Sequence, residues 1–527
     1  MTHSEHASVG PALPRDLDEA VHRCLVAGFE GTTSIPDTLK RLIDRGLGGV
    51  ILFTRNVRDV RQVRELTRAL RAVRPDLLVA IDNEGGGIGH LVNAGAPEVP
   101  GSWALGVVDD TEVTARCADA LAGHLASLGI TASYAPVADL QHHPRNPIVR
   151  TRSFGADPHL VSRHVHAWIT ATEARGIASC AKHFPGHGGT VTDSHHDMAV
   201  DPRPYDELDL DLAPFRAAVA AGVPMLMSAH VVFPALDPDR PATLSPRILS
   251  GLLRDELGFD GVLVSDALEM KAIADRYGEA AGARLALAAG ADQVIVAVPD
   301  LETTVACRDA VLDALRTGAL PEQRVREAAA RVLRLAERYS TPADSVYSAD
   351  LADLADLADL AGPAAQAAPG AVAGWDSGTG LEAARRAVRG RTASAPAPWP
   401  VRGAHVVDLF PPPHPALNWG GEDLLTEVLV IDPAATGTAL TEAPADPAGL
   451  VAGILRRAEG SALVVAVHDA ELYPWQAELR DALLAGRPDA VRVSTGLPEA
   501  GDADDVLCSY GRGRVNLRAV AEVLVGG

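Results

Sequence analysis

Short apolar runs alternate with longer amphipathic stretches across residues 21–340, and this alternation constrains the fold more than any other feature of the sequence. The runs are mostly continuous, which is typical of strands covered on both faces. The helical patterns between them include Val60–Val73, Thr111–Leu128, Pro158–Arg175, Leu208–Ala221 and Tyr277–Ala289. The eight expected strands are Cys24–Phe29, Gly49–Thr54, Leu77–Asp82, Ile130–Leu140, Ile177–Phe184, Met225–Phe233, Gly261–Asp266 and Gln293–Val298.

Eight strands alternating with helices over about 300 residues fit a (β/α)8 barrel in number and in length. A doubly wound open sheet produces the same alternation, and periodicity alone does not separate the two folds. We expect an α/β protein whose barrel occupies residues 21–340, after an N-terminal tail at residues 1–20.

The composition changes near residue 340. Four copies of Ala-Asp-Leu at residues 349–360 lead into a stretch rich in Ala, Pro and Gly, which predicts a linker over residues 341–403 with a short helix at Leu381–Val388. Alternation then resumes, with strands expected at His405–Phe410, Glu427–Ile431, Ala462–His468, Ala490–Thr495 and Asp505–Ser509. Residues 404–527 are therefore expected to form a smaller α/β sandwich with a mainly parallel sheet, which packs or assembles rather than catalyses.

Charge and cysteine content exclude several classes of function. The formal net charge of −22 repels phosphate backbones and anionic lipids, so no nucleic-acid or membrane partner is expected. No stretch approaches the roughly 20 apolar residues of a membrane span, and the N-terminus lacks the apolar core of a secretory signal. Five scattered cysteines fit a reducing compartment. We expect a cytoplasmic monomer or homodimer.

Ionisable residues follow most of the expected barrel strands. Because barrel active sites lie at the carboxyl ends of the strands, these residues are expected to share one rim. They include Asp82, Asp139, His230 and Asp266, and the densest group is the segment Lys182–Asp197, with one lysine, four histidines and two aspartates. Lys182 is also one of only three lysines among 47 basic residues, which suggests a role for its compact ammonium group.

Three interpretations of the Lys182–Asp197 segment remain open from the residues alone. His183 and His187 have metal-ligand spacing only on a helix, which Pro185-Gly186 disfavour, so no metal is expected. A solvated loop with incidental histidines is the second interpretation. Acid–base catalysis is the third, because residues i and i+2 of an extended loop lie on one side, where Asp193 can orient His195.

Asp266 and the glycine-rich turn after the third strand also have alternatives. Asp266 ends an apolar run, so it is either the cap of a following helix or a carboxylate exposed in a cleft. The turn Gly85–Gly89 lacks the last glycine of a dinucleotide fingerprint, since His90 stands there. The sequence also has no GK[ST] loop and no GxSxG elbow, so no cofactor is expected.

Five segments in order resemble the motifs of glycoside hydrolase family 3, in its β-N-acetylglucosaminidase branch. The resemblance covers most of residues 20–340, and residues 404–527 are similar only in outline to the second domain of two-domain members. The five segments are Ile81–Gly86, Arg152–Gly155, Lys182–Gly188, Asp193–His195 and Ser265–Met270.

The resemblance implies a retaining exo-glycosidase that releases terminal GlcNAc. In this branch, Asp266 would be the nucleophile that forms a covalent glycosyl-enzyme, and His195, oriented by Asp193, would be the acid/base. Cell-wall fragments or chito-oligosaccharides would be the substrates, and recycling of peptidoglycan would be the pathway. Hydroxyl groups of the sugar would be bound by Asp82, Arg152, Lys182 and His183.

Two positions depart from the family pattern. Gly87 and His90 stand where the family often has arginine, so a sugar contact is lost or His90 takes its place. A neutral imidazole does not repel an anionic acceptor as a carboxylate does, so a phosphorylase is the alternative within the family. A non-catalytic sugar-binding paralogue and a metal-dependent hydrolase are the other hypotheses.

Overall fold

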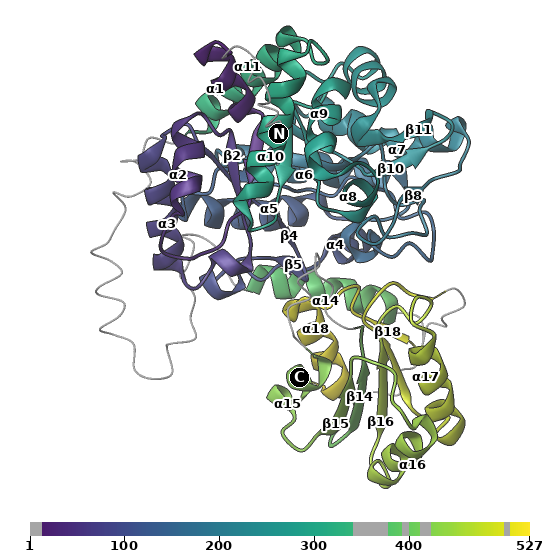
Figure 1. Cartoon of the computed structure of the whole chain (residues 1–527). Helices are drawn as coiled ribbons and strands as arrows, with labels where there is room; N and C mark the ends of the chain where they lie inside the picture. The colour runs from purple at the N-terminus through teal and green to yellow at the C-terminus, as the bar shows by residue number, and fades with distance from the viewer. Residues whose placement is uncertain (1–12, 341–377, 393–399, 412–422, 500–505, 527) are drawn as a thin grey trace, which may run out of the picture.

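The computed structural model describes residues 13–340, 378–392, 400–411, 423–499 and 506–526 (Figure 1). Its first part is a closed barrel of eight parallel strands, which confirms the predicted fold, and the strands follow chain order around the barrel. They are β1 (Leu25–Ala27), β2 (Gly49–Leu52), β3 (Leu78–Ile81), β6 (Ala132–Ser133), β7 (Ala178–Phe184), β9 (Met225–Ser228), β12 (Val262–Ala267) and β13 (Gln293–Val296).

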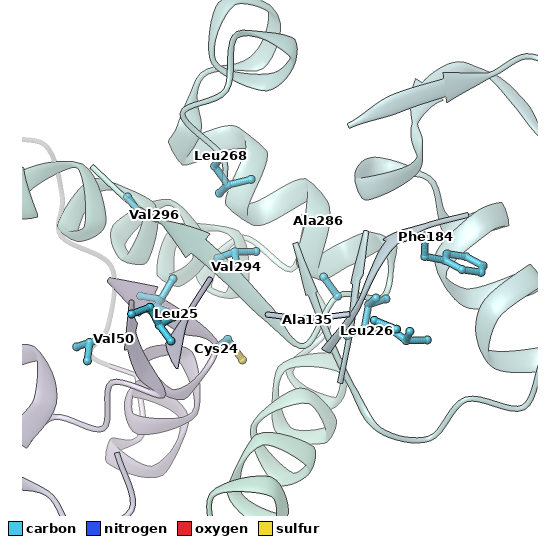
Figure 2. Close-up of a cluster of buried hydrophobic side chains, with 14 of the residues drawn as sticks. Cys24, Leu25, Val50, Ala135, Phe184, Leu226, Leu268, Ala286, Val294 and Val296 are labelled. Atoms are coloured by element: carbon cyan, nitrogen blue, oxygen red, sulfur yellow. The ribbon is translucent and has the colours of Figure 1, made fainter. Parts of the chain in front are cut away.

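Both faces of the barrel strands are buried, which explains their continuous apolar sequences. In β1, Val26 belongs to the cluster that fills the barrel, whereas Leu25 and Ala27 belong to the layer between strands and helices. Figure 2 shows part of this outer layer, where Leu25, Val50 and Val294 lie on neighbouring strands.

Helices surround the barrel, and the five predicted helical patterns are all present with ends shifted by at most a few residues. Aspartates begin several of these helices: Asp59, Asp110, Asp157 and Asp300 each accept a backbone N–H of the first turn. The N-terminal helix begins at Arg15, inside the predicted tail. The helices of this part are α1 (Arg15–Arg23), α2 (Asp37–Asp44), α3 (Val60–Val73), α4 (Ser102–Val108), α5 (Thr111–Ser127), α6 (Pro158–Ala174), α7 (Tyr205–Ala220), η5 (Arg247–Glu256), α8 (Lys271–Tyr277), α9 (Glu279–Ala289), α10 (Leu301–Arg316) and α11 (Glu322–Tyr339).

Additional short elements extend the loops that follow the barrel strands. A two-stranded ribbon of β4 (Asn83–Gly85) and β5 (Ile88–Gly89) follows β3, and the short helix η3 (Arg150–Arg152) follows β6. A small sheet combines β8 (Ala199–Val200) with the hairpin of β10 (Val231–Phe233) and β11 (Asp237–Pro241). The predicted strand Met225–Phe233 is therefore divided between the barrel and this sheet.

The C-terminal part is a second α/β unit with a five-stranded parallel sheet, as predicted. Its strand order is β15-β14-β16-β17-β18, and apolar clusters lie on both faces of the sheet. The elements are α14 (Gly378–Thr392), β14 (His405–Leu409), α15 (Leu424–Ile431), β15 (Thr436–Leu440), α16 (Pro447–Arg457), β16 (Leu463–Val467), α17 (Pro474–Gly486), β17 (Val491–Ser494), β18 (Val506–Cys508) and α18 (Arg514–Val525).

One predicted strand of this unit is wrong. The run Glu427–Ile431 belongs to helix α15, which Asp423 caps by accepting the N–H of Thr426. Short apolar runs are compatible with either a buried strand or a helix, and here the capping aspartate favours the helix. The strand that pairs with β14 is instead Thr436–Leu440, an edge strand with little apolar signal.

Helix α14 connects the two parts of the chain, because it packs against α4 and α5 of the barrel part and against α18 (Figure 1). It contains the predicted helix Leu381–Val388. The Ala-Asp-Leu repeat lies outside the described residues, and the predicted domain boundaries stay predictions. Within the described ranges, no helix has the length and apolar content that crossing a membrane requires.

Candidate active site

A cavity of about 520 Å³ opens at the carboxyl ends of the barrel strands. Residues from seven of these strands or the segments directly after them line it, so the fold collects residues that are far apart in sequence. Its polar lining comprises Arg55, Asp82, Glu84, His90, Tyr134, Arg152, Lys182, His183, His187, Ser194, His195, His196, Asp266, Glu269 and Lys271.

Asp266 reaches the cavity from a β-bulge in strand β12. Val264 and Ala267 pair with Gln293 and Ile295, so three steps on β12 oppose two on β13. A bulge of this kind redirects side chains at the end of a strand. The side chain of Ser265 compensates for the irregular pairing, because its Oγ accepts the N–H of Ile295 at 3.1 Å.

The surroundings of Asp266 favour a carboxylate. Burial raises the pKa of Asp266, but the imidazoles of His230, His183 and His195 outweigh burial and lower that pKa below its ordinary value. The N–H of Ala267 also donates to its Oδ1 at 2.8 Å. Helix α8 begins only at Lys271, so Asp266 does not cap a helix as the alternative interpretation required.

A second bulge brings His183 to the cavity. Ala181 and Phe184 of β7 pair with Leu226 and Ser228 of β9, so Lys182 and His183 occupy the irregular step. Nδ1 of His183 donates to Oδ2 of the buried Asp139 at 2.7 Å, which leaves Nε2 as the nitrogen that can contact a ligand. Asp139 lies near the end of the fourth predicted strand, Ile130–Leu140, and its role as the partner of His183 was not predicted.

Four charged side chains form a network along one wall of the cavity. Nζ of Lys182 lies 2.6 Å from Asp82 and 2.7 Å from Glu84. Glu84 also accepts two hydrogen bonds from the guanidinium of Arg152, at 2.8 and 2.9 Å. Burial raises the pKa of Glu84, but Arg152 and Lys182 outweigh it and hold that pKa well below its usual range. The network therefore holds donors and acceptors in fixed positions.

His195 is carried by the loop after β7 and is paired with Asp193. Oδ1 of Asp193 accepts from both the backbone N–H and Nδ1 of His195, each at 2.8 Å. The predicted contact is therefore present, although it forms in a tight turn rather than in an extended segment. Because Nδ1 donates to the carboxylate, proton exchange with a ligand would fall to Nε2.

Two further contacts fix this loop. Nε2 of His187 lies 3.0 Å from Oγ of Ser194, and the carbonyl oxygen of Ser194 accepts the N–H of Ala272 at 3.3 Å. Burial lowers the pKa of His187 to about 4, so this anchor is a neutral imidazole. The loop is thus attached to helix α8, which follows Asp266.

His90 also lines the cavity, at a position where the family pattern often has arginine. Its Nδ1 is 3.0 Å from Oγ1 of Thr54, and its ring contacts Phe53 edge-on. Burial lowers the pKa of His90, so it faces the cavity as a neutral ring. In the described part of the chain, no group of three or more His, Cys, Asp or Glu side chains is arranged to hold a metal ion.

Comparison with known proteins decides the family. The family model "Glycosyl hydrolase family 3 N terminal domain" matches residues 22–335, which is more than half of the chain. The chain belongs to glycosyl hydrolase family 3. It is therefore a glycoside hydrolase, as the motifs predicted.

Relatives of this hydrolase carry more specific names. It is 37% identical to the β-hexosaminidase of Bordetella pertussis over 320 residues, which are 59% of this chain and 87% of that protein. It is 33% identical to β-hexosaminidase A of Pseudoalteromonas piscicida, of which it spans only 55%. Its structure is similar to that of a family 3 β-N-acetylglucosaminidase from Paenibacillus sp. str. FPU-7, with a TM-score of 0.82, 30% identity and 98% and 97% of the two chains covered.

The structure brings all the predicted site residues of the hydrolase together: seven line the cavity, and the eighth, Asp193, contacts it through His195. Glu84 was not predicted as the acceptor shared by Lys182 and Arg152, although it lies in the motif Ile81–Gly86. Glu269, whose pKa burial raises to about 7, was not predicted either. The signal for Glu269 was present, because it follows Asp266 by three residues in the same motif.

Proposed function

We propose that this family 3 hydrolase is a retaining exo-β-N-acetylglucosaminidase. One observation carries the proposal: Asp266 and His195 line the same cavity, and His195 is paired with a carboxylate. The names of the similar proteins, β-hexosaminidase and β-N-acetylglucosaminidase, support a terminal N-acetylhexosamine as the sugar that is released.

In the first step, an oxygen of the Asp266 carboxylate attacks the anomeric carbon of the sugar. The bond between that carbon and the glycosidic oxygen breaks, and the proton on Nε2 of His195 moves to the departing oxygen. The products of this step are the free aglycone, a covalent glycosyl-aspartate and a neutral His195. The low pKa of Asp266 supports this assignment, because only the ionised carboxylate is a nucleophile.

In the second step, water attacks the anomeric carbon from the side that the aglycone left. Neutral His195 accepts a proton from this water at Nε2, and the bond to Asp266 breaks. Two inversions give net retention. Asp193 holds the imidazole in the required tautomer and stabilises its protonated form in both steps.

The other predicted residues would bind the sugar. Lys182 and Arg152 offer donors from a network in which Glu84 fixes both cations, and Asp82 offers an acceptor beside them. Nε2 of His183 supplies a further contact, since Asp139 occupies its other nitrogen. His90 supplies an uncharged ring where an arginine is common, so we propose that it changes the range of sugars rather than the reaction.

Mass spectrometry with a slow or 2-fluoro GlcNAc-type inactivator tests the proposal. The wild-type enzyme should hydrolyse 4-nitrophenyl β-N-acetylglucosaminide, and the inactivator should add one sugar mass to the peptide that contains Asp266. Turnover with the label on another peptide would refute Asp266 as the nucleophile. Absence of turnover with every N-acetylhexosaminide tested would refute the substrate class.

Phosphorolysis is a second candidate, favoured by the acid/base being a histidine. A carboxylate base would repel a phosphate acceptor, whereas neutral His195 does not, and Lys182 and Arg152 make the wall cationic in part. Product analysis in phosphate buffer separates the two reactions. Release of the sugar 1-phosphate would make phosphate the acceptor, and free sugar alone would exclude it.

The natural substrate and its place in the cell form the finer part of the proposal. We propose GlcNAc-containing cell-wall fragments or chito-oligosaccharides as substrates, and recycling of peptidoglycan in the cytoplasm as the setting. The five scattered cysteines support a reducing compartment. Release of GlcNAc from purified muropeptides, compared with chitobiose, tests the choice of substrate.

A further inference from the structure

A buried ion pair joins the barrel to the C-terminal unit. Nη2 of Arg150 lies 2.6 Å from Oδ1 of Asp469, and the two side chains are only 6% and 3% exposed. The backbone φ angles of Arg150 and Asp469 are positive, 41° and 58°, a conformation that residues other than glycine rarely adopt. Packing on both sides therefore holds this pair in place.

Each partner of the pair is anchored in its own unit. The backbone N–H of Arg150 donates to Gln141 at 2.7 Å, and its Nη1 donates to the carbonyl oxygen of Pro144 at 2.5 Å. On the other side, Oδ1 of Asp469 also accepts the N–H of Leu497 at 3.0 Å. The ion pair thus connects the loop after β6 to the loops after β16 and β17.

The barrel side of the pair belongs to the same turn as a proposed sugar-binding residue. Helix η3 consists of Arg150, Thr151 and Arg152 alone, so movement of the first residue moves the third. Arg152 donates from this turn to Glu84 and lines the cavity. Asp469 is therefore linked to the cavity through one short turn.

A second contact reaches Glu84, the partner of Arg152. Glu84 is followed by the turn Gly85-Gly86, on which Gly513 packs closely: a Cβ atom on Gly513 would lie 2.7 Å from the carbonyl carbon of Gly86. Beside it, Asn516 of α18 accepts the N–H of Gly101 at 3.3 Å. The C-terminal unit therefore contacts the turn that follows Glu84 and, through Asp469, the short helix that contains Arg152.

We propose that the C-terminal unit positions the sugar-binding wall. Asp469 fixes the position of Arg152 through Arg150, and Gly513 fixes the position of Glu84 through Gly86. This inference rests on the proposed function, because it takes the wall formed by Glu84, Arg152 and Lys182 as the sugar site. Asp469 and Gly513 do not line the cavity and are positioning residues. Loosening either contact should weaken sugar binding in the ground state and in the transition state alike.

The first test is Asp469→Asn in the full chain. We expect KM for 4-nitrophenyl β-N-acetylglucosaminide and the inhibition constant of free GlcNAc each to rise about tenfold, with kcat changed less than about threefold. The matched control is Glu499→Gln, which removes a carboxylate of the same unit that pairs with Arg480 at 2.8 Å and does not line the cavity. In the control, KM and the inhibition constant of GlcNAc should be the same as in the wild-type enzyme.

The second test is Gly513→Ala, which leaves the ion pair intact. The backbone of Gly513, with φ −59° and ψ 145°, accepts alanine, so the added methyl group acts only by pressing on Gly86. We expect the same rise in KM and in the GlcNAc inhibition constant. Its control is Gly453→Ala in α16, where a Cβ would meet only arginine side chains at 3.5 Å or more.

The outcomes separate this inference from the proposed function. If the wild-type enzyme hydrolyses the substrate but both variants, folded by circular dichroism, keep KM and the GlcNAc constant within twofold, the positioning role is overturned. Lower melting temperatures with unchanged constants in both variants also overturn it, because the two contacts would then have a structural role only. If Asp469→Asn does not fold, Gly513→Ala decides. An inactive wild type overturns the proposed function itself.

Discussion

Nζ of Lys182 lies 2.7 Å from Oε1 of Glu84, and each side chain is only 3% exposed. Arg152 and Asp82 complete a wall in which two buried cations face two carboxylates. Buried charges are tolerated only while their partners remain, so this wall is stable as a set rather than as four independent residues. A substitution in this wall should therefore affect both the stability of the fold and the binding of the sugar.

Glu84→Gln should destabilise the fold. It leaves Lys182 and Arg152 without their shared carboxylate, which should lower the free energy of unfolding by about 3–5 kcal/mol at pH 7. The pKa of Glu84 is lowered in the folded state, so its contribution is present above the unfolded value of about 4.3 and is lost as the pH falls below it. Urea unfolding at pH 7 and pH 3.5 measures both effects.

Glu65→Gln is the matched control for this change. Glu65 pairs with Arg61 on the surface and is 54% exposed, so its loss should change the free energy of unfolding by less than about 0.5 kcal/mol. A Glu84 variant no less stable than this control would contradict the charge network.

Lys182→Arg should impair the enzyme although it keeps the charge. The ammonium fits between Asp82 and Glu84 at 2.6 and 2.7 Å, and a planar guanidinium is too large for this buried position. We expect kcat/KM to fall about 100-fold. Lys40→Arg is the control, since Lys40 is half exposed and 3.4 Å from Asp37, and steady-state kinetics on both variants would show the contrast.

The barrel could be predicted because its strands are continuous apolar runs buried on both faces. Where a strand is short of apolar residues, as in the edge strand Thr436–Leu440, the pattern gave no signal, and the apolar run Glu427–Ile431 was assigned to the wrong element. Periodicity reports burial, and it does not distinguish a short buried helix from a strand.

The site was predictable where one motif contained both partners, as with Asp193 and His195. Contacts between distant segments were not, because Asp139 meets His183 only through adjacent strands of the closed barrel. The link from Asp469 to Arg150 spans the two units and leaves no local pattern. Their spacing in the sequence can identify such residues as candidates for a catalytic or binding role, but only the fold determines which side chains they contact.

Glu269→Gln should change how stability depends on pH. Burial, with a smaller contribution from Asp266, raises the pKa of Glu269 to about 7, above the unfolded value of about 4.3. The folded protein therefore binds an extra proton between these values, and its stability falls as the pH rises through that window. Relative to wild type, the free energy of unfolding of the variant should rise by about 1–3 kcal/mol between pH 5 and pH 8. Urea unfolding of both proteins over this range measures the difference, and parallel pH profiles of wild type and variant would refute the raised pKa of Glu269.

Asp266→Ala should remove the covalent route. We expect kcat to fall by about 10⁴-fold or more, while the GlcNAc inhibition constant changes little because the polar wall is intact. A small anion such as azide should restore part of the turnover by occupying the space of the carboxylate and attacking the anomeric carbon from the same side. The specific product is a glycosyl azide, which mass spectrometry would detect. A fall in kcat of less than tenfold would exclude Asp266 as the nucleophile.

His195→Ala should show a loss that depends on the leaving group. A nitrophenolate leaves with little protonation, so kcat/KM on the nitrophenyl substrate should fall much less than on chitobiose, whose sugar oxygen needs a proton. Asp193→Asn should reproduce this contrast with smaller losses, because Asp193 acts by orienting His195 through the 2.8 Å contact to Nδ1. Steady-state kinetics of both variants on both substrates measure the contrast, and equal losses on the two substrates would mean that His195 is not the general acid.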